Sequence, residues 1–293
     1  MSQDLGRLSI NRATTGPWPL RELVAACVER GISGIGLWRE DVTELGVQEA
    51  ARVVRDAGMS VTSLCRGGFF TDPDPAERQL RRDDNRRAID EAATLGTDVL
   101  VLVCGGLPPG DTDLPGARTR VVDAIAELVP YASERGVRLA IEALHPMFCS
   151  DRSVVSTLDQ ALDIADQSSV EAVGVVVDAY HVWWDPRLDE AVRRAGERIV
   201  AFQVCDWVTP LPEGVLTGRG VMGDGCIPLR SLRRAVDGAG YDGPIEVEIF
   251  SDALWNRPGP EVLELIVARY LAHVVEESEQ SPNAPRNDSR SPT

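Results

Sequence analysis

The stretch DVLVLVC, residues 98–104, is an unbroken apolar run, and the helical pattern that follows it ends at Gly136. The next apolar run, VRLAIEAL at 137–144, begins directly after that glycine. Continuous runs of Val, Ile and Leu are typical of strands that are covered on both faces. Two such runs joined by an amphipathic helix form a parallel strand–helix–strand unit. The sequence therefore predicts a parallel sheet in this part of the chain.

The same alternation extends over the whole chain and produces eight units. The predicted strands are residues 7–11, 34–38, 60–65, 98–104, 137–144, 173–178, 199–206 and 244–250. Eight units in about 250 residues indicate an α/β protein with one domain, a (β/α)8 TIM barrel. An open doubly wound sheet is disfavoured, because the first turn, NRATTGPWP, lacks the GxGxxG pattern. We place the barrel at residues 1–277 and predict a disordered C-terminal tail at 278–293, which is rich in Ser, Pro and Asn.

The charged residues exclude several classes of protein. The 293-residue chain has a formal net charge of −16, and all 30 of its basic residues are arginine. Without lysine there is no amine for a Schiff base, for pyridoxal phosphate or for a P-loop. The acidity argues against a nucleic-acid partner, because phosphates attract clustered cations. Only three histidines are present, so a centre with several histidine ligands is excluded.

The sequence shows no pattern of export or membrane insertion. The N-terminus, MSQDLGRLSI, does not resemble a signal peptide, and no apolar run approaches the ~18 residues of a membrane span. The six cysteines form no CxxC pair, which favours buried, reduced thiols. We therefore expect a cytoplasmic protein without a membrane partner.

Three acidic residues stand in otherwise apolar strands: Glu142 in IEALHP, Asp178 in DAYHVWW and Glu248 in EVEIF. Catalytic groups of this barrel lie at the C-terminal ends of strands. A buried carboxylate is costly unless it is paired or bound to a cation, and oxygen ligands suit Mg²⁺ or Mn²⁺. Each acid also has a structural interpretation: Glu246 and Glu248 pointing outward to helix arginines, Asp178 capping a helix, or Glu142 in a buried ion pair. The position of all three at strand ends favours a metal site.

Other polar residues follow the same strand ends. His145 and His181 each come three residues after a strand-end acid, and Arg66 lies in the Gly-rich turn CRGGFF, where the backbone can approach a ligand closely. The long loop after the seventh strand is rich in Gly and Pro and carries Arg219 and Asp224. Such loops often close over a substrate. Arg66 also has a structural interpretation, an ion pair between loops.

With these residues in place, nearly the whole chain resembles the xylose isomerase-like TIM-barrel superfamily, the sugar phosphate isomerase/epimerase group. The resemblance rests on Glu142 in LAIEALHP, on Asp178 with His181 in VVVDAYH, and on Glu248 in GYDGPIEVEIF. The FQVCD stretch of the seventh strand adds to it. Many relatives have a histidine where this chain has Gln203, whose amide oxygen is still a ligand for a hard cation.

The resemblance implies a divalent metal, Mn²⁺ or Mg²⁺, held by Glu142, Asp178, Gln203 and Glu248. It implies that Glu142 and Glu248 are the acid–base pair of a metal-dependent isomerase or epimerase. The substrate would be a small carbohydrate (a sugar, keto-polyol or sugar acid) that loses a proton next to its carbonyl and forms an enediolate. The resemblance further implies substrate contacts from basic side chains: Arg66, His145, His181 and Arg219. Association into an oligomer is common for such barrels and stays open here.

Other functions match parts of the pattern. A lyase or dehydratase on a keto-sugar or keto-glycoside would share the proton abstraction and expel a group from the β carbon, and His145 close to Glu142 agrees with it. A catalytically silent partner subunit is suggested by Gln203. A DNA-repair endonuclease with the same barrel is disfavoured by the few histidines and the negative charge. Phe148 stands where ketose 3-epimerases of the superfamily place a substrate-binding Glu, so a free-ketohexose epimerase is not a close match.

Overall fold

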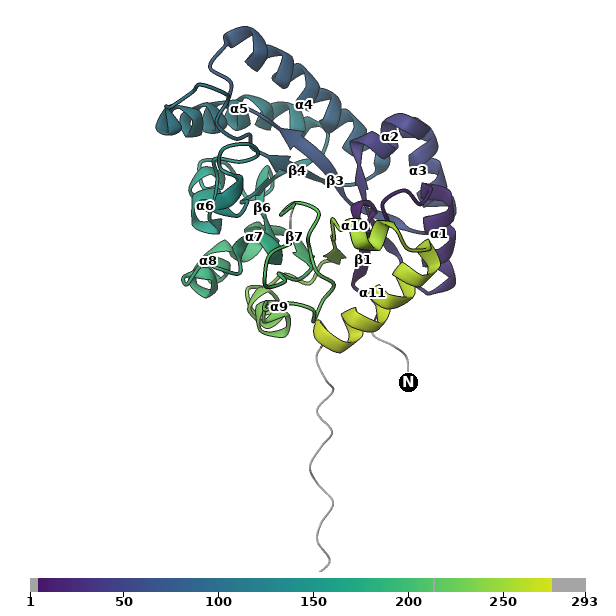
Figure 1. The fold of residues 1–293 in the computed structure, drawn as a ribbon. Helices are drawn as coiled ribbons and strands as arrows, with labels where there is room; N and C mark the ends of the chain where they lie inside the picture. Colours follow the sequence, from purple (N-terminus) through teal and green to yellow (C-terminus); the bar gives the residue numbers. More distant parts are fainter. Residues whose placement is uncertain (1–4, 213, 276–293) are drawn as a thin grey trace, which may run out of the picture.

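The fold is a closed barrel of eight parallel strands surrounded by helices (Figure 1). The structure is a computed structural model that describes residues 5–212 and 214–275. The tail predicted at 278–293 lies outside the described residues. Each strand pairs with the next one in the sequence, and β8 closes the barrel against β1. The prediction of a TIM barrel with one domain is confirmed.

Each observed strand overlaps its predicted range. The strands are β1 (Leu8–Asn11), β2 (Gly34–Trp38), β3 (Ser60–Gly68), β4 (Val99–Val103), β5 (Arg138–Glu142), β6 (Val173–Asp178), β7 (Ile199–Val204) and β8 (Ile245–Val247). β3 is longer than predicted, because Gly67 and Gly68 continue to pair with β4. β8 is shorter than its apolar run, so that Glu248 follows directly after the paired residues.

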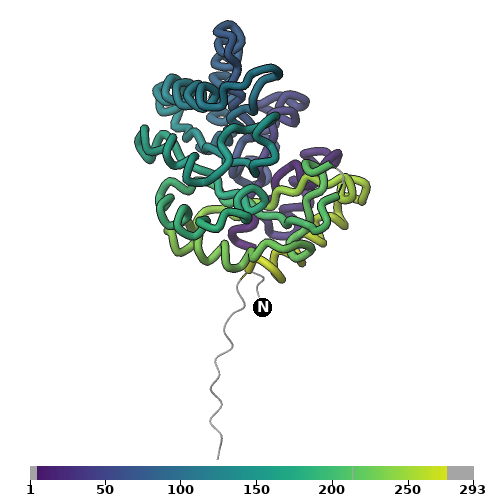
Figure 2. The backbone as a smooth tube through the Cα atoms, turned by 60° about the vertical axis from the view of Figure 1, so that its left-hand side comes forward, coloured from purple at the N-terminus to yellow at the C-terminus, as the bar shows by residue number. Residues whose placement is uncertain are grey.

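The helices form an outer ring, which Figure 2 shows from a second side. The helices that the pattern predicts are α1 (Leu20–Glu29), α3 (Val47–Asp56), α4 (Pro75–Leu95), α5 (Leu114–Glu134), α6 (Leu158–Ala165), α8 (Leu188–Ala195), α9 (Leu229–Gly238) and α11 (Gly259–His273). The short helices that it misses are α2 (Arg39–Leu45), α7 (Ala179–Val182), α10 (Asp252–Trp255) and the 3-10 turns η1 (Arg12–Thr15), η2 (Pro146–Phe148) and η3 (Gly196–Arg198). Among the described residues, no helix combines the length and apolar character of a membrane span.

Local chemistry explains where the long helix α4 begins and ends. Asp74 caps its N-terminus by accepting a hydrogen bond from the backbone N–H of Ala76 at 2.8 Å, and Pro75 occupies the first turn, where no N–H is needed. Gly96 ends the helix with a left-handed φ of 79°, a conformation that glycine adopts without strain. The cap and the glycine together set the position of β4, which begins three residues later.

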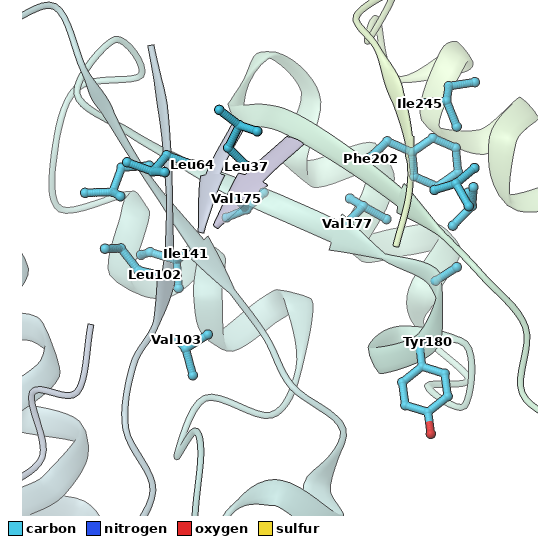
Figure 3. Packing of buried hydrophobic residues seen from close by; sticks show 14 of the residues in the cluster. Leu37, Leu64, Leu102, Val103, Ile141, Val175, Val177, Tyr180, Phe202 and Ile245 are labelled. Atoms are coloured by element: carbon cyan, nitrogen blue, oxygen red, sulfur yellow. The ribbon is translucent and has the colours of Figure 1, made fainter. Parts of the chain in front are cut away.

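Along each strand, successive side chains point alternately toward the helices and toward the barrel interior. In β4, Leu102 packs in the core between strands and helices (Figure 3), and its neighbour Val101 packs in a smaller cluster. Ala140 of β5 and Val176 of β6 belong to that same smaller cluster, which fills the inside of the barrel. Residues two positions further along β5 and β6 therefore also point inward, at the C-terminal end of the barrel.

Candidate active site

Three carboxylates meet inside the C-terminal end of the barrel. Glu142 ends β5, Asp178 ends β6, and Glu248 follows β8. All three residues are buried, with 6%, 1% and 3% of their surface exposed. An oxygen of Glu142, an oxygen of Asp178 and a ring nitrogen of His181 lie within 4.8 Å of one another. The structure thus brings together the strand-end acids that the sequence singles out.

Among the described residues, Arg219 is the arginine that pairs with these acids. Its Nη1 donates to Glu248 Oε2 at 3.1 Å and to Asp178 Oδ2 at 3.3 Å. Its guanidinium lies 4.5 Å from the ring centre of Tyr180 and 4.9 Å from that of Phe250. Only 5% of the residue is exposed. Arg219 therefore forms a buried ion pair with two of the three acids, held between aromatic rings.

The loop after β7 places Arg219 in this position. Two short backbone bridges, Asp206 with Gly220 and Gly218 with Ser251, hold the loop on both sides of the arginine. Asp224, the other residue that the sequence suggests as a loop contact, instead pairs with Arg269 of α11 at 2.6 Å. The structure therefore directs Arg219 toward the acids and Asp224 away from them.

Burial raises the pKa of all three acids, and repulsion between carboxylates adds to the shift of Glu142 and Glu248. The pKa of Glu142 lies well above its usual range because of burial first and then the charges of Glu248 and Asp178. Burial raises the pKa of Glu248 to about 8, although Arg219 opposes the shift, and burial raises the pKa of Asp178 in the same way. One guanidinium does not neutralise three carboxylates. The site therefore takes up protons or another cation.

We expect the metal-free protein to lose stability as the pH rises. An acid whose pKa is higher in the folded state stabilises the fold fully below its unfolded pKa, and this contribution is lost as the pH rises through the folded pKa. For Glu248 the window runs from 4.5 to about 8. In the presence of EDTA, thermal unfolding should give a lower Tm at about pH 8.5 than at about pH 6, and Glu248→Gln should reduce the difference. If the Tm difference between the two pH values were the same in wild type and in Glu248→Gln, the raised pKa of Glu248 would be contradicted.

Gln203 and Glu246 are two further buried polar residues next to the acids. Gln203 pairs in register with Asp178 of β6, and its Nε2 donates to Glu246 Oε1 at 3.0 Å. Its Oε1 is buried and has no hydrogen-bond partner within the described residues. Glu246 contacts Gln203 and Glu248 contacts Arg219, so the interpretation in which both glutamates point outward to helix arginines is wrong. The shared face of β8 is the barrel interior.

This set of side chains suits a hard divalent cation. Glu142, Asp178 and Glu248 offer carboxylate oxygens, and Gln203 offers an amide oxygen that no group of the described chain satisfies. Mg²⁺ and Mn²⁺ prefer oxygen ligands. A cation among the carboxylates would also offset the burial and the repulsion that raise their pKa values. The residues present therefore fit the metal that the sequence suggests.

His181 is oriented by a backbone group. The N–H of His145 donates to His181 Nδ1 at 3.2 Å, which turns Nε2 toward the acids. This nitrogen lies 3.7 Å from Asp178 Oδ2 and 3.2 Å from Arg219 Nη2. Arg219 Nη2 and His181 Nε2 form a hydrogen bond whose donor depends on the tautomer of the ring. Burial, and then the charge of Arg219, lowers the pKa of His181 well below its usual range. His181 belongs, with Glu142 and Asp178, to a group of side chains that could hold a metal ion.

Glu142 and Glu248 line a pocket at the C-terminal end of the barrel, which we call the mouth pocket. It is lined by charged residues and by a mainly apolar wall: Glu142, Glu248, Arg66, Arg152, Arg219, His181, Trp38, Cys65, Val103, Leu144, Phe148, Leu216 and Phe250. Of the predicted substrate contacts, Arg66, His181 and Arg219 line it. His145 is not among the lining residues, because its ring stacks on Trp207 with 4.8 Å between ring centres.

Two arginines of the mouth pocket, Arg66 and Arg152, make no hydrogen bond or ion pair with the three acids within the described residues. The guanidinium of Arg66 lies 4.6 Å from the ring centre of Phe69 and has no hydrogen bond or ion pair within the described residues. Burial lowers its pKa, and the charge of Arg152 adds to this, although Glu40 opposes it. The sequence reasoning missed Arg152. The available signal was its place in the loop between β5 and α6, which also carries His145.

Comparison with known proteins places this geometry in a family. A family model described as xylose isomerase-like TIM barrel matches residues 24–268. The chain belongs to this family. The resemblance suggested by the strand-end motifs is thereby confirmed.

Relatives of this xylose isomerase-like chain carry out different reactions. The chain is 26% identical over 246 residues to the 3-dehydroshikimate dehydratase of Pseudomonas putida KT2440, covering 82% of the chain and 37% of that protein. It is 27% identical over 147 residues to the inosose isomerase of Bacillus subtilis 168, covering 49% and 51%. The crystal structure of protein SMc04130 from Sinorhizobium meliloti 1021 matches with a TM-score of 0.90 and 49% identity, over 92% of this chain and 99% of that one. The chain thus spans about half or less of the two curated relatives, whose names describe enzymes.

Proposed function

We propose that this protein is a metal-dependent sugar isomerase or epimerase that moves a proton next to the carbonyl of its substrate. The observation that carries the proposal is that Glu142, at the end of β5, and Glu248, directly after β8, converge on one pocket. Two protein carboxylates that have raised pKa values and face the same substrate can act in turn as base and acid. Proton removal by one and return by the other gives an isomer or an epimer.

The other residues of the pocket bind and orient the substrate in this proposal. A divalent ion held by Glu142, Asp178, Gln203 and Glu248 would polarise the substrate carbonyl and the adjacent hydroxyl. His181 turns its Nε2 toward a substrate oxygen, and Arg219 donates to developing negative charge while it stays bonded to Glu248.

The two arginines that do not pair with the acids, Arg66 and Arg152, indicate the substrate class. Arg66 and Arg152 both line the mouth pocket, and the charge of Arg152 disfavours the charged form of Arg66. A substrate carboxylate between them would remove this repulsion and accept charge-assisted hydrogen bonds. We therefore propose a sugar acid or a hydroxylated keto acid as the substrate, in preference to a neutral sugar.

Dehydration is the second candidate reaction. The alignment with the dehydratase covers 82% of this chain, against 49% for the isomerase, and the arginine pair suits an acidic substrate. In this reaction one glutamate takes the proton from the α carbon. The hydroxyl leaves the β carbon with a proton from the other glutamate, so that the products are water and an unsaturated ketone. The same carboxylate pair serves both reactions.

The test is mass spectrometry of substrates incubated with the Mn²⁺-loaded protein in heavy water. The panel contains sugar acids and hydroxylated keto acids, each matched with its neutral analogue. Deuterium uptake without loss of water would support the isomerase or epimerase, and loss of water would support the dehydratase. Arg66→Gln should raise the KM of acids about tenfold or more and leave neutral analogues unchanged. No exchange and no water loss with any compound would contradict both functions.

A further inference from the structure

A buried carboxylate that the proposed function does not use lies on β8, two residues before Glu248. Glu246 is 3% exposed. It accepts hydrogen bonds from four neutral side chains: Asn11 Nδ2 at 2.7 Å, Thr62 Oγ1 at 2.7 Å, Ser63 Oγ at 2.9 Å and Gln203 Nε2 at 3.0 Å. Within the described residues no arginine or histidine pairs with it. A buried ion without a counter-charge is costly, and an apolar side chain would fill the space at lower cost.

The surroundings of Glu246 are built for a carboxylate. Gly36 of β2 leaves the space, because a Cβ at that position would lie 2.5 Å from Glu246 Oε2. The amide of Asn11 is turned by two donors, Trp38 Nε1 and the N–H of Ala13, which each reach its Oδ1 at 2.9 Å. Its Nδ2 must therefore face Glu246. The interior of the barrel presents donors to this carboxylate from β1, β3 and β7.

Gln203 lies between this carboxylate and Asp178 in the sheet. In the sheet register it pairs with Asp178 on one side and with Glu246 on the other. A glutamine amide has two orientations of similar shape, with oxygen and nitrogen exchanged. A carboxylate only accepts hydrogen bonds, so Glu246 selects the orientation in which Nε2 faces it. The oxygen must then point away from Glu246, and it is the atom that has no partner in the described chain.

We infer that Glu246 is a positioning residue, which fixes the Gln203 amide so that Oε1 is available as a ligand to the metal. The inference rests on the metal site of the proposed function. An amide nitrogen carries two protons and does not bind a cation, so a turned amide would remove one ligand and place a donor beside the ion. The hydrogen bond to Glu246 is charge-assisted, which makes the selection stronger than a neutral partner would. Residues that orient a ligand in this way typically change metal affinity 10–100-fold when they are replaced.

Metal affinity in the absence of substrate tests the inference. Mn²⁺ binding would be measured by calorimetry and by electron paramagnetic resonance of free Mn²⁺, with the Tm of each metal-free variant alongside. Glu246→Gln and Glu246→Asp should each lower Mn²⁺ affinity about tenfold or more. The first variant removes the charge. Glu246→Asp keeps the charge, but its shorter side chain moves the carboxylate away from Gln203. In the double variant Gln203→Glu with Glu246→Gln the two groups exchange places, so most of the affinity should return.

The matched control is Glu91→Gln, which removes an acid whose Oε2 pairs with Arg39 Nε at 2.6 Å outside the barrel. It should leave Mn²⁺ affinity unchanged even if the Tm falls. Wild-type affinity in Glu246→Asp would show that charge alone matters and would overturn the inference, as would wild-type affinity in Glu246→Gln. In both cases the metal site of the proposed function would stand. A wild-type protein that binds no Mn²⁺ would overturn the inference and the proposed function together.

Discussion

Replacing Glu142 by glutamine should reduce proton exchange about a thousandfold and at the same time stabilise the metal-free protein at about pH 8. The first effect follows because the amide neither takes up the proton nor offers a charged ligand. The second follows because burial and the charges of Glu248 and Asp178 disfavour the Glu142 carboxylate, as its raised pKa shows. A neutral amide of the same shape does not have this cost. Loss of activity with a gain in stability would separate a chemical role from misfolding.

The measurement combines deuterium exchange, bound Mn²⁺ by elemental analysis, and thermal unfolding in EDTA. Glu248→Gln should show the same loss of exchange and of metal. The control is Glu127→Gln, which removes an exposed glutamate that pairs with Arg82 at 3.0 Å on the outer helices, and it should change none of the three. Exchange within about tenfold of wild type in Glu142→Gln would exclude this residue from the acid–base pair.

Replacing Arg219 by methionine should destabilise the metal-free protein by about 3–5 kcal/mol at about pH 8. The variant leaves Asp178 and Glu248 buried without their counter-charge, and it loses the contacts with the rings of Tyr180 and Phe250. At about pH 5.5 the loss should be smaller, because the carboxylates with raised pKa values take up protons. Saturating Mn²⁺ should also recover part of the loss.

The matched control for Arg219 is Arg269→Met. Arg269 pairs with Asp224 at 2.6 Å, but both side chains are about one-third exposed, so its loss should cost at most about 1 kcal/mol. Denaturant unfolding at two pH values, with and without Mn²⁺, measures all of these differences. An Arg219→Met protein as stable as Arg269→Met at high pH would show that the arginine does not neutralise the acids.

The sequence alone predicts the barrel, because its signals are local. Each strand is an apolar run that stands out from its flanking helices, as DVLVLVC does, and glycines such as Gly96 and Gly136 mark the helix ends. Eight repeats of one unit leave few arrangements. The strand-end position of Glu142 and Asp178 follows from the same pattern, because the carboxyl ends of parallel strands meet at one end of a barrel.

The roles of Gln203 and Glu246 became visible only in the folded barrel. Strands that are covered on both faces have no polar side, so the alternation of Glu246 and Glu248 does not say which face of β8 is inside. Closure of β8 against β1 and β7 decides this, and it brings Gln203 and Asn11 to Glu246 from strands far apart in the sequence.

The loops show the same division between local and tertiary information. Their sequences place His145, Arg152 and Arg219 near the C-terminal ends of strands. They do not determine the directions in which these side chains point. Backbone bridges direct Arg219 to the acids, and stacking on Trp207 keeps the ring of His145 out of the mouth pocket. The sequence by itself determined the fold and the strand-end acids, because periodicity is a local property. The tertiary structure decided which charges meet, because ion pairing and stacking depend on distances between segments that only the closed barrel brings together.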